Sequence, residues 1–212
     1  FGMTWGRAMH EFVEQLAKDE RLRSLSFQNV KVVPFLGTPG AIQSDSWNTT
    51  TYSNTLATKV GNLLHCASYN LSAPMYVEGT KEKELIESID EIAKVLHMAE
   101  TADIALIGIG SMQDDSSIIK AEIRTKEEYK ELVRKGAVGE IVGRIYDKNG
   151  QTVDEDLKRK MVGISLDKIA KIPVRVGMSY GKDKIEAIKG AIAGGLVNVL
   201  VTDVPTAELL LK

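Results

Sequence analysis

The chain has 212 residues, of which 43% are hydrophobic and 26% charged, with a formal net charge of -2. These values are ordinary for one globular α/β domain, and they provide no basic patch with which this chain by itself would bind nucleic acid. No apolar run reaches the roughly 18–20 residues of a membrane span, and no basic-then-apolar leader opens the sequence. Cys66 is the single cysteine and falls in an apolar run predicted to be helical, so we expect a buried thiol, no intramolecular disulfide and a cytoplasmic location.

The first residues predict a strand that turns into a helix. Phe1–Gly6 ends in small and hydroxyl residues, and apolar residues recur at helical spacing from Met9 to Leu16. Thr4, Gly6 and Arg7 would lie at the N-terminus of that helix, where free N–H groups and the helix dipole favour an anion. Thr4 as an ordinary helix cap and Arg7 as a solvated surface residue are the alternatives.

A second strand is predicted over Val30–Leu36, and the turn sequence Gly37–Gly40 follows it. Two strands then end in glycine and hydroxyl residues, and two such loops side by side make a better anion site than either alone. The polar residues 41–50 are predicted to form a loop that covers this site, and a helix is predicted over 51–69. The candidate ligand residues of this region are Gly37, Thr38, Gly40 and Asn54.

The most informative stretch runs from Thr101 to Ser111. Residues Ile104–Gly108 show no polar alternation, which is typical of a strand buried on both faces of a parallel sheet. Gly108, Gly110 and Ser111 follow at once. Ligands of open α/β sheets lie beyond the carboxyl ends of the strands, where glycines let backbone N–H groups approach an anion. The two glycines can equally serve only to make the tight turn that leaves the strand.

Two charged residues in the second half of the chain are candidates for ligand contact. Arg124 precedes a helix predicted over 126–135 and is either a surface charge or a ligand partner. Glu140 lies near the start of a strand predicted over 136–147, where it is either an edge charge or a hydrogen-bond acceptor for a polyol. Asp147–Gly150 predicts a hairpin-type turn.

The remaining elements follow from apolar periodicity. Short strands are expected over 74–78, 161–166, 172–177 and 196–201. A helix is expected over 81–100, with Leu85 and Ile89 facing inward. Another is expected from the segment 179–184 onward, with Ile192 facing inward, and a last one from about 205. The polar segment 112–117 is expected to be a surface loop or a lid.

Lys184 falls in the first turn of the helix that opens at 179–184. The positive end of a helix dipole disfavours a cation unless an anion shares the site, so this lysine points to phosphate. The sequence contains no Walker loop, dinucleotide fingerprint, nucleophile elbow or zinc-binding helix, and none of its three histidines has a partner at metal-ligand spacing. We therefore assign no cofactor and no metal. Glycine, hydroxyl and basic residues at strand ends suit a phosphorylated polyol.

Several blocks together resemble the effector-binding domain of SorC-type bacterial transcriptional regulators. This family includes the sorbitol and sorbose operon regulators, the deoxyribonucleoside regulator and the central glycolytic gene regulator. The resemblance covers essentially the whole chain. The blocks are Gly2–Gly6, Val33–Gly37, Ala102–Ser111, Gly136–Gly143, Lys184–Ile188 and Gly194–Asp203.

The resemblance implies a three-layer α/β/α fold with a mostly parallel sheet, related to ribose-5-phosphate and glucosamine-6-phosphate isomerases but without their catalytic machinery. Residues 1–212 would form one domain that binds a sugar or sugar phosphate and assembles into dimers or tetramers. A helix-turn-helix DNA-binding domain is expected upstream but absent here, since the chain starts at Phe1 without an initiator methionine. Operator DNA would be reached only through that domain, and no membrane is involved.

The resemblance also implies ligand contacts. They are Gly37, Thr38 and Gly40 in the second strand-end loop, Gly108 and Ser111 in the central loop, Arg124 and Lys184 as phosphate or hydroxyl partners, Glu140 as the acceptor for sugar hydroxyls, and Thr4, Gly6 and Asn54 as further candidates. Where the family often has a Gly-Gly turn, this chain has Ser179–Lys182, which makes Lys182 a competitor of Lys184. The family also often has a glycine pair in place of Gly37-Thr38. The second strand ends in Phe35-Leu36 rather than a Schiff-base lysine, so reversible non-covalent binding is expected.

Two alternatives remain at this point. A sugar-phosphate isomerase would need a carboxylate or histidine beside the substrate carbons, and Glu140 is the one strong carboxylate candidate, without a partner histidine near it in sequence. A purely structural assembly module would leave the polar residues at the strand ends unexplained.

Overall fold

The structure is a computed structural model that describes residues 1–39 and 49–212. Gly40 and most of the loop predicted over 41–50 lie outside these residues. Among the described helices, none is long and apolar enough to cross a membrane.

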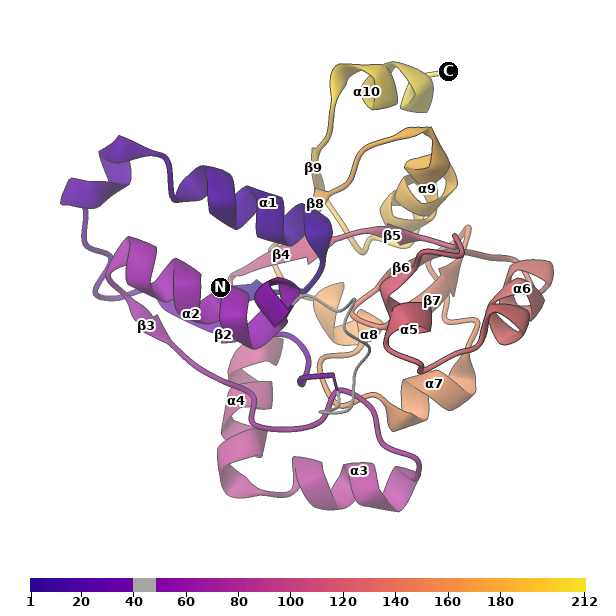
Figure 1. Cartoon of the computed structure of the whole chain (residues 1–212), viewed down its shortest axis with the longest axis horizontal. Helices are drawn as coiled ribbons and strands as arrows, with labels where there is room; N and C mark the ends of the chain where they lie inside the picture. The colour runs from indigo at the N-terminus through magenta and orange to yellow at the C-terminus, as the bar shows by residue number, and fades with distance from the viewer. Residues whose placement is uncertain (40–48) are drawn as a thin grey trace.

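A six-stranded sheet forms the centre of the molecule (Figure 1). In spatial order its strands are β3 (Ala67–Ser68), β2 (Lys31–Pro34), β1 (Gly2–Met3), β4 (Ile104–Gly108), β8 (Val174–Met178) and β9 (Val199–Val201). Every neighbouring pair in this sheet is parallel. The carboxyl ends of the strands therefore meet at one edge, which is where open α/β sheets bind ligands.

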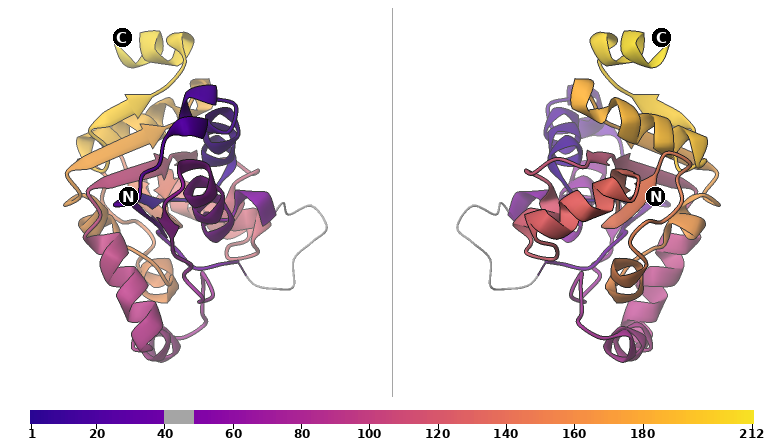
Figure 2. Two further views of the ribbon diagram at one scale, coloured as in Figure 1. Left: turned by 90° about the vertical axis from the view of Figure 1, so that its left-hand side faces the viewer. Right: turned by 90° about the vertical axis from the view of Figure 1, so that its right-hand side faces the viewer.

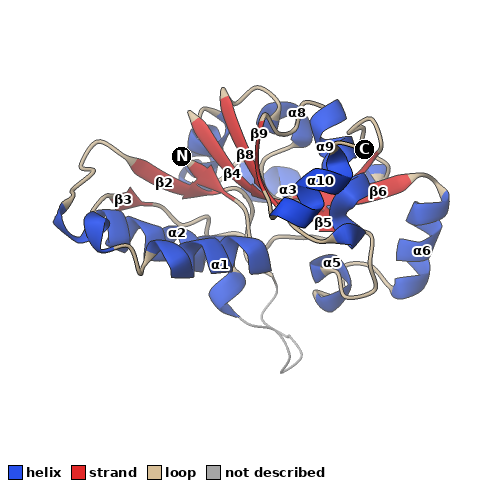
Figure 3. Ribbon diagram, turned by 90° about the horizontal axis from the view of Figure 1, so that it is seen from above, coloured by secondary structure: helices blue, strands red, loops and turns tan. Residues whose placement is uncertain are grey.

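Helices cover the two faces of this sheet, as Figure 3 shows for α1 (Arg7–Leu16) and α2 (Ser53–Leu64) on one side. Met3 and Leu106 pack on that side, whereas Ala105 and Ile107 are fully buried on the other. The second side is covered by α4 (Asp90–Glu100) and α9 (Ile185–Ala193), with the smaller elements beside them. The three-layer α/β/α prediction is confirmed. The prediction of a strand buried on both faces fails at its first residue, because Ile104 is 38% exposed.

A second, three-stranded antiparallel sheet corrects the single strand predicted over 136–147. It consists of β5 (Gly110–Ser111), β6 (Ala137–Ile141) and β7 (Arg144–Asp147). The chain reverses at Val142 and Gly143, both with positive φ angles, 55° and 68°. The predicted turn at Asp147–Gly150 also forms, since the Gly150 amide donates to the Asp147 carbonyl at 2.9 Å. Val142 did not suggest a turn in the sequence because β-branched residues rarely adopt positive φ.

The helix predicted over 81–100 is two helices. Its parts are α3 (Thr80–Glu87) and α4, which meet at Ser88 and Ile89. The Ser88 hydroxyl donates to the Leu85 carbonyl at 2.7 Å, a side-chain bond that competes with continuation of the helix. Leu85 and Ile89 are 70% and 51% exposed, so their predicted inward positions are wrong.

Three further predictions are corrected. Helix α2 ends at Leu64 because His65 adopts a left-handed conformation with φ 49°, so Cys66 lies beyond the helix and is half-buried. The segments 74–78 and 161–166 form isolated bridges, Tyr76 with Met161 among them, instead of strands. Ile192 is half exposed rather than packed on the sheet.

Short elements complete the chain. They are η1 (Glu20–Ser24), η2 (Thr49–Thr51), α5 (Ser117–Lys120), α6 (Lys126–Arg134), α7 (Glu155–Lys160), α8 (Leu166–Ile169), η3 (Lys182–Lys184) and α10 (Val204–Leu210). The last of these carries the C-terminus and projects above the sheet, as both views of Figure 2 show.

Candidate functional site

A cavity of about 310 Å³ lies at the carboxyl edge of the parallel sheet. Its walls come from the residues after β1, β4 and β8, from β5 and β6 of the second sheet, and from the starts of α1, α5 and α9. The predicted site residues that line it are Gly6, Gly108, Ser111, Glu140 and Lys184. Two predicted strand-end loops and two predicted charges therefore meet in one place.

Lys184 is the central cation of this cavity. Its Nζ donates to Ser111 Oγ at 2.8 Å, and Ser111 Oγ in turn donates to Asp183 Oδ2 at 3.2 Å. Asp183 Oδ2 also lies 3.6 Å from Lys184 Nζ. The side chain of Lys184 is 20% exposed, whereas Lys182 is exposed and is not among the cavity-lining residues. Of the two competing lysines, Lys184 therefore lines the cavity and Lys182 does not.

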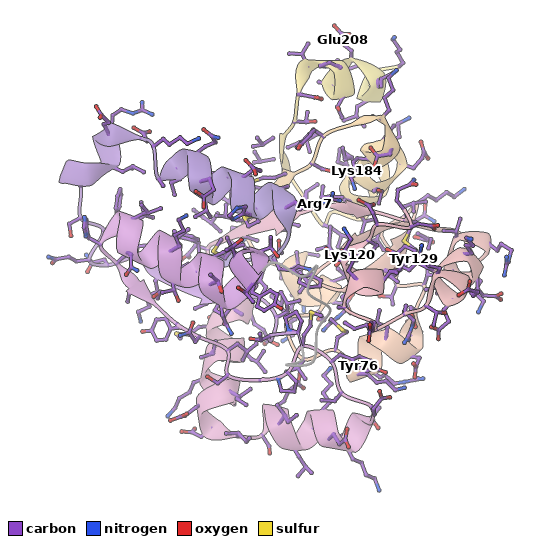
Figure 4. All side chains as sticks on the ribbon, in the orientation of Figure 1. Arg7, Tyr76, Lys120, Tyr129, Lys184 and Glu208 are labelled. Carbon is purple, nitrogen blue, oxygen red and sulfur yellow. The ribbon has the colours of Figure 1, made fainter. Side chains whose placement is uncertain are left out.

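Figure 4 labels Lys184, which lines this cavity from η3 just before α9, and Arg7, which lines it from the start of α1. Arg7 Nη2 donates to Asp115 Oδ2 at 2.7 Å, and both side chains are more than half exposed. The Arg7 guanidinium lowers the pKa of the Asp115 carboxyl. Among the described residues, no side chain caps the N-terminus of α1, and Gly6 reaches its φ of 107° because it has no Cβ. The first-turn N–H groups of α1, which have no partner within the helix, therefore adjoin the cavity.

Glu140 is the buried carboxyl group of the cavity, at 7% exposure. It lies on β6 opposite Gly110 of β5, and its Oε1 accepts a hydrogen bond from the Gly143 amide. Burial raises the pKa of Glu140 to about 7, against the lowering effects of the Gly143 amide, Lys184, Trp5 and Arg144. A Cβ on Gly110 would lie 2.8 Å from Glu140 Oε2, so the glycine leaves room for the carboxylate.

Thr4 lies behind the cavity rather than in its lining. Its side chain is fully buried, and its Oγ1 accepts the Gly108 amide hydrogen at 2.8 Å. This bond joins the end of β1 to the end of β4. Ser179, which sequence reasoning did not select, joins the ends of β8 and β4. Its Oγ donates to the Ile109 carbonyl at 3.1 Å. Its position two residues after the strand predicted over 172–177 was the available signal.

Four other predicted residues are placed elsewhere or lie outside the described residues. Asn54 Nδ2 donates to Thr38 Oγ1 at 2.9 Å, and both residues line a second, more open hollow beside α2. Gly37 packs directly on backbone, because a Cβ there would lie 2.5 Å from the Ala73 carbonyl oxygen. Gly40 is not described.

Arg124 is also outside the cavity lining. Its guanidinium forms two hydrogen bonds with Asp154, at 2.9 and 3.2 Å, and one with Asp156 at 3.0 Å. The side chains of Arg124 and Asp154 are only 9% and 7% exposed. The side chain of Arg124 therefore forms a buried ion pair, and this pair joins the segment before α6 to the start of α7.

No metal-binding cluster is present in the part of the chain that the structure describes. Within residues 1–39 and 49–212, no three His, Cys, Asp or Glu side chains are grouped so as to hold a metal ion. The cavity lining offers the Lys184 ammonium, the Arg7 guanidinium, the buried carboxyl of Glu140, the exposed carboxylates of Asp115 and Asp183, hydroxyl groups and backbone amides. A small polar cavity at the carboxyl ends of a parallel sheet, in a three-layer α/β/α domain, defines a small-molecule-binding domain of the doubly wound class.

Comparison with known proteins identifies the family. The sugar-binding domain family "Sugar-bind" matches residues 1–212. The sorbitol operon regulator of Klebsiella pneumoniae is 30% identical over 213 residues, which cover 100% of this chain and 64% of the regulator. The transcriptional regulator LsrR of Escherichia coli O157:H7 is 35% identical over 159 residues, 73% of this chain and 50% of LsrR.

Solved structures agree. The full-length sorbitol operon regulator SorC of Klebsiella pneumoniae superposes with a TM-score of 0.86 at 31% identity, over 100% of this chain and 64% of that one. A DeoR family transcriptional regulator from Listeria monocytogenes gives 0.85 at 25% identity, over 99% of this chain and 78% of that one. The chain belongs to the SorC-type family of sugar-binding domains found in transcriptional regulators.

This membership supports the regulator interpretation over the isomerase alternative, because the relatives are transcriptional regulators. The chain spans about half to two thirds of the length of the curated relatives it matches.

Proposed function

We propose that residues 1–212 are the effector-binding domain of a sugar-responsive bacterial transcriptional regulator, and that a sugar or sugar phosphate binds reversibly and non-covalently in the cavity at the carboxyl edge of the sheet. The observation that carries this proposal is the meeting of Lys184, Ser111 and Glu140 in one cavity of a chain that matches the sugar-binding family throughout.

The chemistry of the cavity suits such a ligand. The Glu140 carboxylate can accept hydrogen bonds from vicinal hydroxyls, and Lys184 with the first-turn N–H groups of α1 can bind a phosphate or a sugar hydroxyl. Each charge-assisted hydrogen bond contributes roughly 1.5–3 kcal/mol. A micromolar dissociation constant corresponds to about 8 kcal/mol, so a few contacts of this kind are sufficient.

Ligand contacts by Gly6, Gly108, Ser111, Glu140 and Lys184 form the core of the proposal. Contacts by Thr4, Gly37, Thr38, Gly40, Asn54 and Arg124 stay predictions from the resemblance. In the full-length protein the domain would form homo-oligomers in the cytoplasm and control operator binding by a helix-turn-helix domain. The greater length of the regulators that match this chain supports that arrangement.

The test is isothermal titration and thermal unfolding with a panel of sugars and sugar phosphates. A ligand at one hundred times its dissociation constant adds about 2.7 kcal/mol to the free energy of unfolding. Lys184→Ala should weaken binding by about tenfold or more, because it removes the charge that faces the ligand. Lys182→Ala is the matched control and should bind normally, since that lysine is exposed and outside the cavity lining. Absence of binding by the unmodified protein to every compound at millimolar concentration would refute the proposal.

A further inference from the structure

Arg144, the first residue of β7, is almost completely buried at 2% exposure. Its Nη1 donates to the Val142 carbonyl at 3.1 Å, and its Nη2 donates to the carbonyls of Met161 and Gly163 at 3.2 and 3.1 Å. Its Nε has no hydrogen-bond partner in the described structure. A buried guanidinium held by carbonyl oxygens costs free energy. The reason for this cost is to be sought in the segments that Arg144 joins.

One of these segments is the tight turn between β6 and β7. Ile141 pairs with Arg144 across it, and Val142 occupies a left-handed conformation at φ 55° although it is β-branched. Such strain persists only where the surroundings fix the backbone. The same turn places the Gly143 amide against Glu140 Oε1. The turn that Arg144 holds is therefore the one that orients the cavity carboxylate.

The other segment lies beside the second strand-end loop. Gly163 bridges to Leu36, and the Gly37 amide donates to the Val162 carbonyl at 3.1 Å. Arg144 thus links the Glu140 turn to the backbone around Gly37. The turn beside Glu140 and the loop at Gly37 are far apart in sequence, and the buried Arg144 guanidinium connects them.

We propose that Arg144 is a positioning residue of the effector site: its guanidinium fixes the strained Val142–Gly143 turn so that the Gly143 amide holds the Glu140 carboxylate towards the cavity. The proposal rests on the proposed function, because Glu140 matters as an acceptor only if a polyol binds there. Arg144 itself does not line the cavity.

Other charged and titratable groups influence Glu140 and Arg144. A measurement must separate their effects from the effect of Arg144 on Glu140. Glu140 is influenced by Lys184 on η3. Burial raises the pKa of Tyr129 on α6 and of Tyr146 on β7, and Glu140 adds to both shifts. Arg144 is influenced by Glu87 of α3. Burial lowers the pKa of Lys83 on the same helix, and Arg144 adds to that shift. Of these groups, Glu140 is the one whose carboxylate accepts the Gly143 amide.

The experiment is a ligand-free pH titration of the ¹⁵N-glycine-labelled protein, with the Glu140 carboxyl followed by ¹³C NMR. In the unmodified protein the Gly143 amide resonance should follow the titration of Glu140, with its midpoint near 7. In Arg144→Met that amide should cease to follow, and the Glu140 midpoint should rise by about one unit, because a nearby cation and an amide donor are both lost. Arg175→Met is the matched control. The Arg175 guanidinium also donates to backbone carbonyls, those of Gly195 and Ile172. Arg175 lies in β8 and is not among the cavity-lining residues.

Two further variants keep the proposal testable if Arg144→Met folds poorly. Arg144→Lys keeps the charge but lacks the forked donor, so its Gly143 amide should also lose the Glu140 response. Adding Val142→Gly to Arg144→Met removes the strain that Arg144 opposes and should restore the response. An unchanged Gly143 response in both Arg144 variants, or an equal change in Arg175→Met, overturns the proposal. Because no ligand is present, this result is independent of whether the protein binds sugars.

Discussion

At the scale of single residues, Glu140 shows how one carboxyl group experiences opposing effects. Burial disfavours its charged form, whereas the Gly143 amide and the Lys184 ammonium favour it, and burial prevails. The resulting pKa of about 7 lies well above the ordinary value of 4.5. Glu140 is therefore partly ionised near neutral pH, and its strength as a hydrogen-bond acceptor for hydroxyls depends on pH.

This shift predicts a pH dependence of stability. The folded protein keeps the Glu140 proton up to a pH of about 7, whereas the unfolded chain releases it near 4.5. The stabilising effect is complete below 4.5 and is lost as the pH rises to about 7, at roughly 1.4 kcal/mol per unit. Glu140→Gln should remove this part of the pH dependence, which urea denaturation at pH 5 and pH 8 would measure. Parallel stability profiles for the variant and the unmodified protein would contradict the assignment.

At the scale of secondary-structure elements, the ion pair of Arg124 and Asp154 joins two parts of the chain. Asp154 Oδ1 accepts the Leu157 amide at 2.9 Å as the N-cap of α7, and both Asp154 oxygens accept hydrogen bonds from Arg124. Arg124 also donates to the Ile123 carbonyl at 3.0 Å. The start of α7 is thus fixed to the segment that leads into α6.

We expect Arg124→Ala to lower the free energy of unfolding by about 3–5 kcal/mol, because Asp154 would be left as a buried, unpaired charge. The matched control is Lys94→Ala, which removes an exposed pair with Asp90 of similar length, 2.6 Å, and should cost less than about 1 kcal/mol. Chemical denaturation measures both.

The same variant tests the role that the resemblance implied for Arg124. At a temperature where Arg124→Ala is folded, unchanged sugar affinity would assign the residue to the fold, and a loss of affinity matching that of Lys184→Ala would assign it to the ligand.

At the scale of the whole molecule, the proposed sensor requires coupling between sugar and DNA. In the full-length protein, the effector should change operator affinity by about 5–150-fold, and operator DNA should change effector affinity by the same factor. Fluorescence anisotropy with labelled operator and calorimetry with the sugar measure the two sides of this linkage. Lys184→Ala should abolish the response of operator affinity to the sugar while leaving operator binding without sugar intact. Sugar binding that leaves operator affinity unchanged would contradict the regulatory part of the proposal.

The sequence by itself determined the features that depend on neighbours along the chain. The apolar run before Gly108 predicted β4, because a strand buried in a parallel sheet needs no polar alternation. Lys184 at the start of α9 and Ser111 after β4 were selected by their place at element ends. Parallel strands bring their carboxyl ends to one edge, so these local signals also predicted that the residues would meet.

Only the tertiary structure decided the features that depend on distant partners. The 136–147 segment forms a hairpin with its turn at Val142 and Gly143, and this hairpin brings Glu140 into the cavity. Arg124 took no part in the cavity lining because Asp154, 30 residues away, holds it. Asp183 was missed because its bond to Ser111 spans 72 residues. Charge and hydrogen-bond partners are chosen by proximity in space, and local sequence patterns do not encode that proximity.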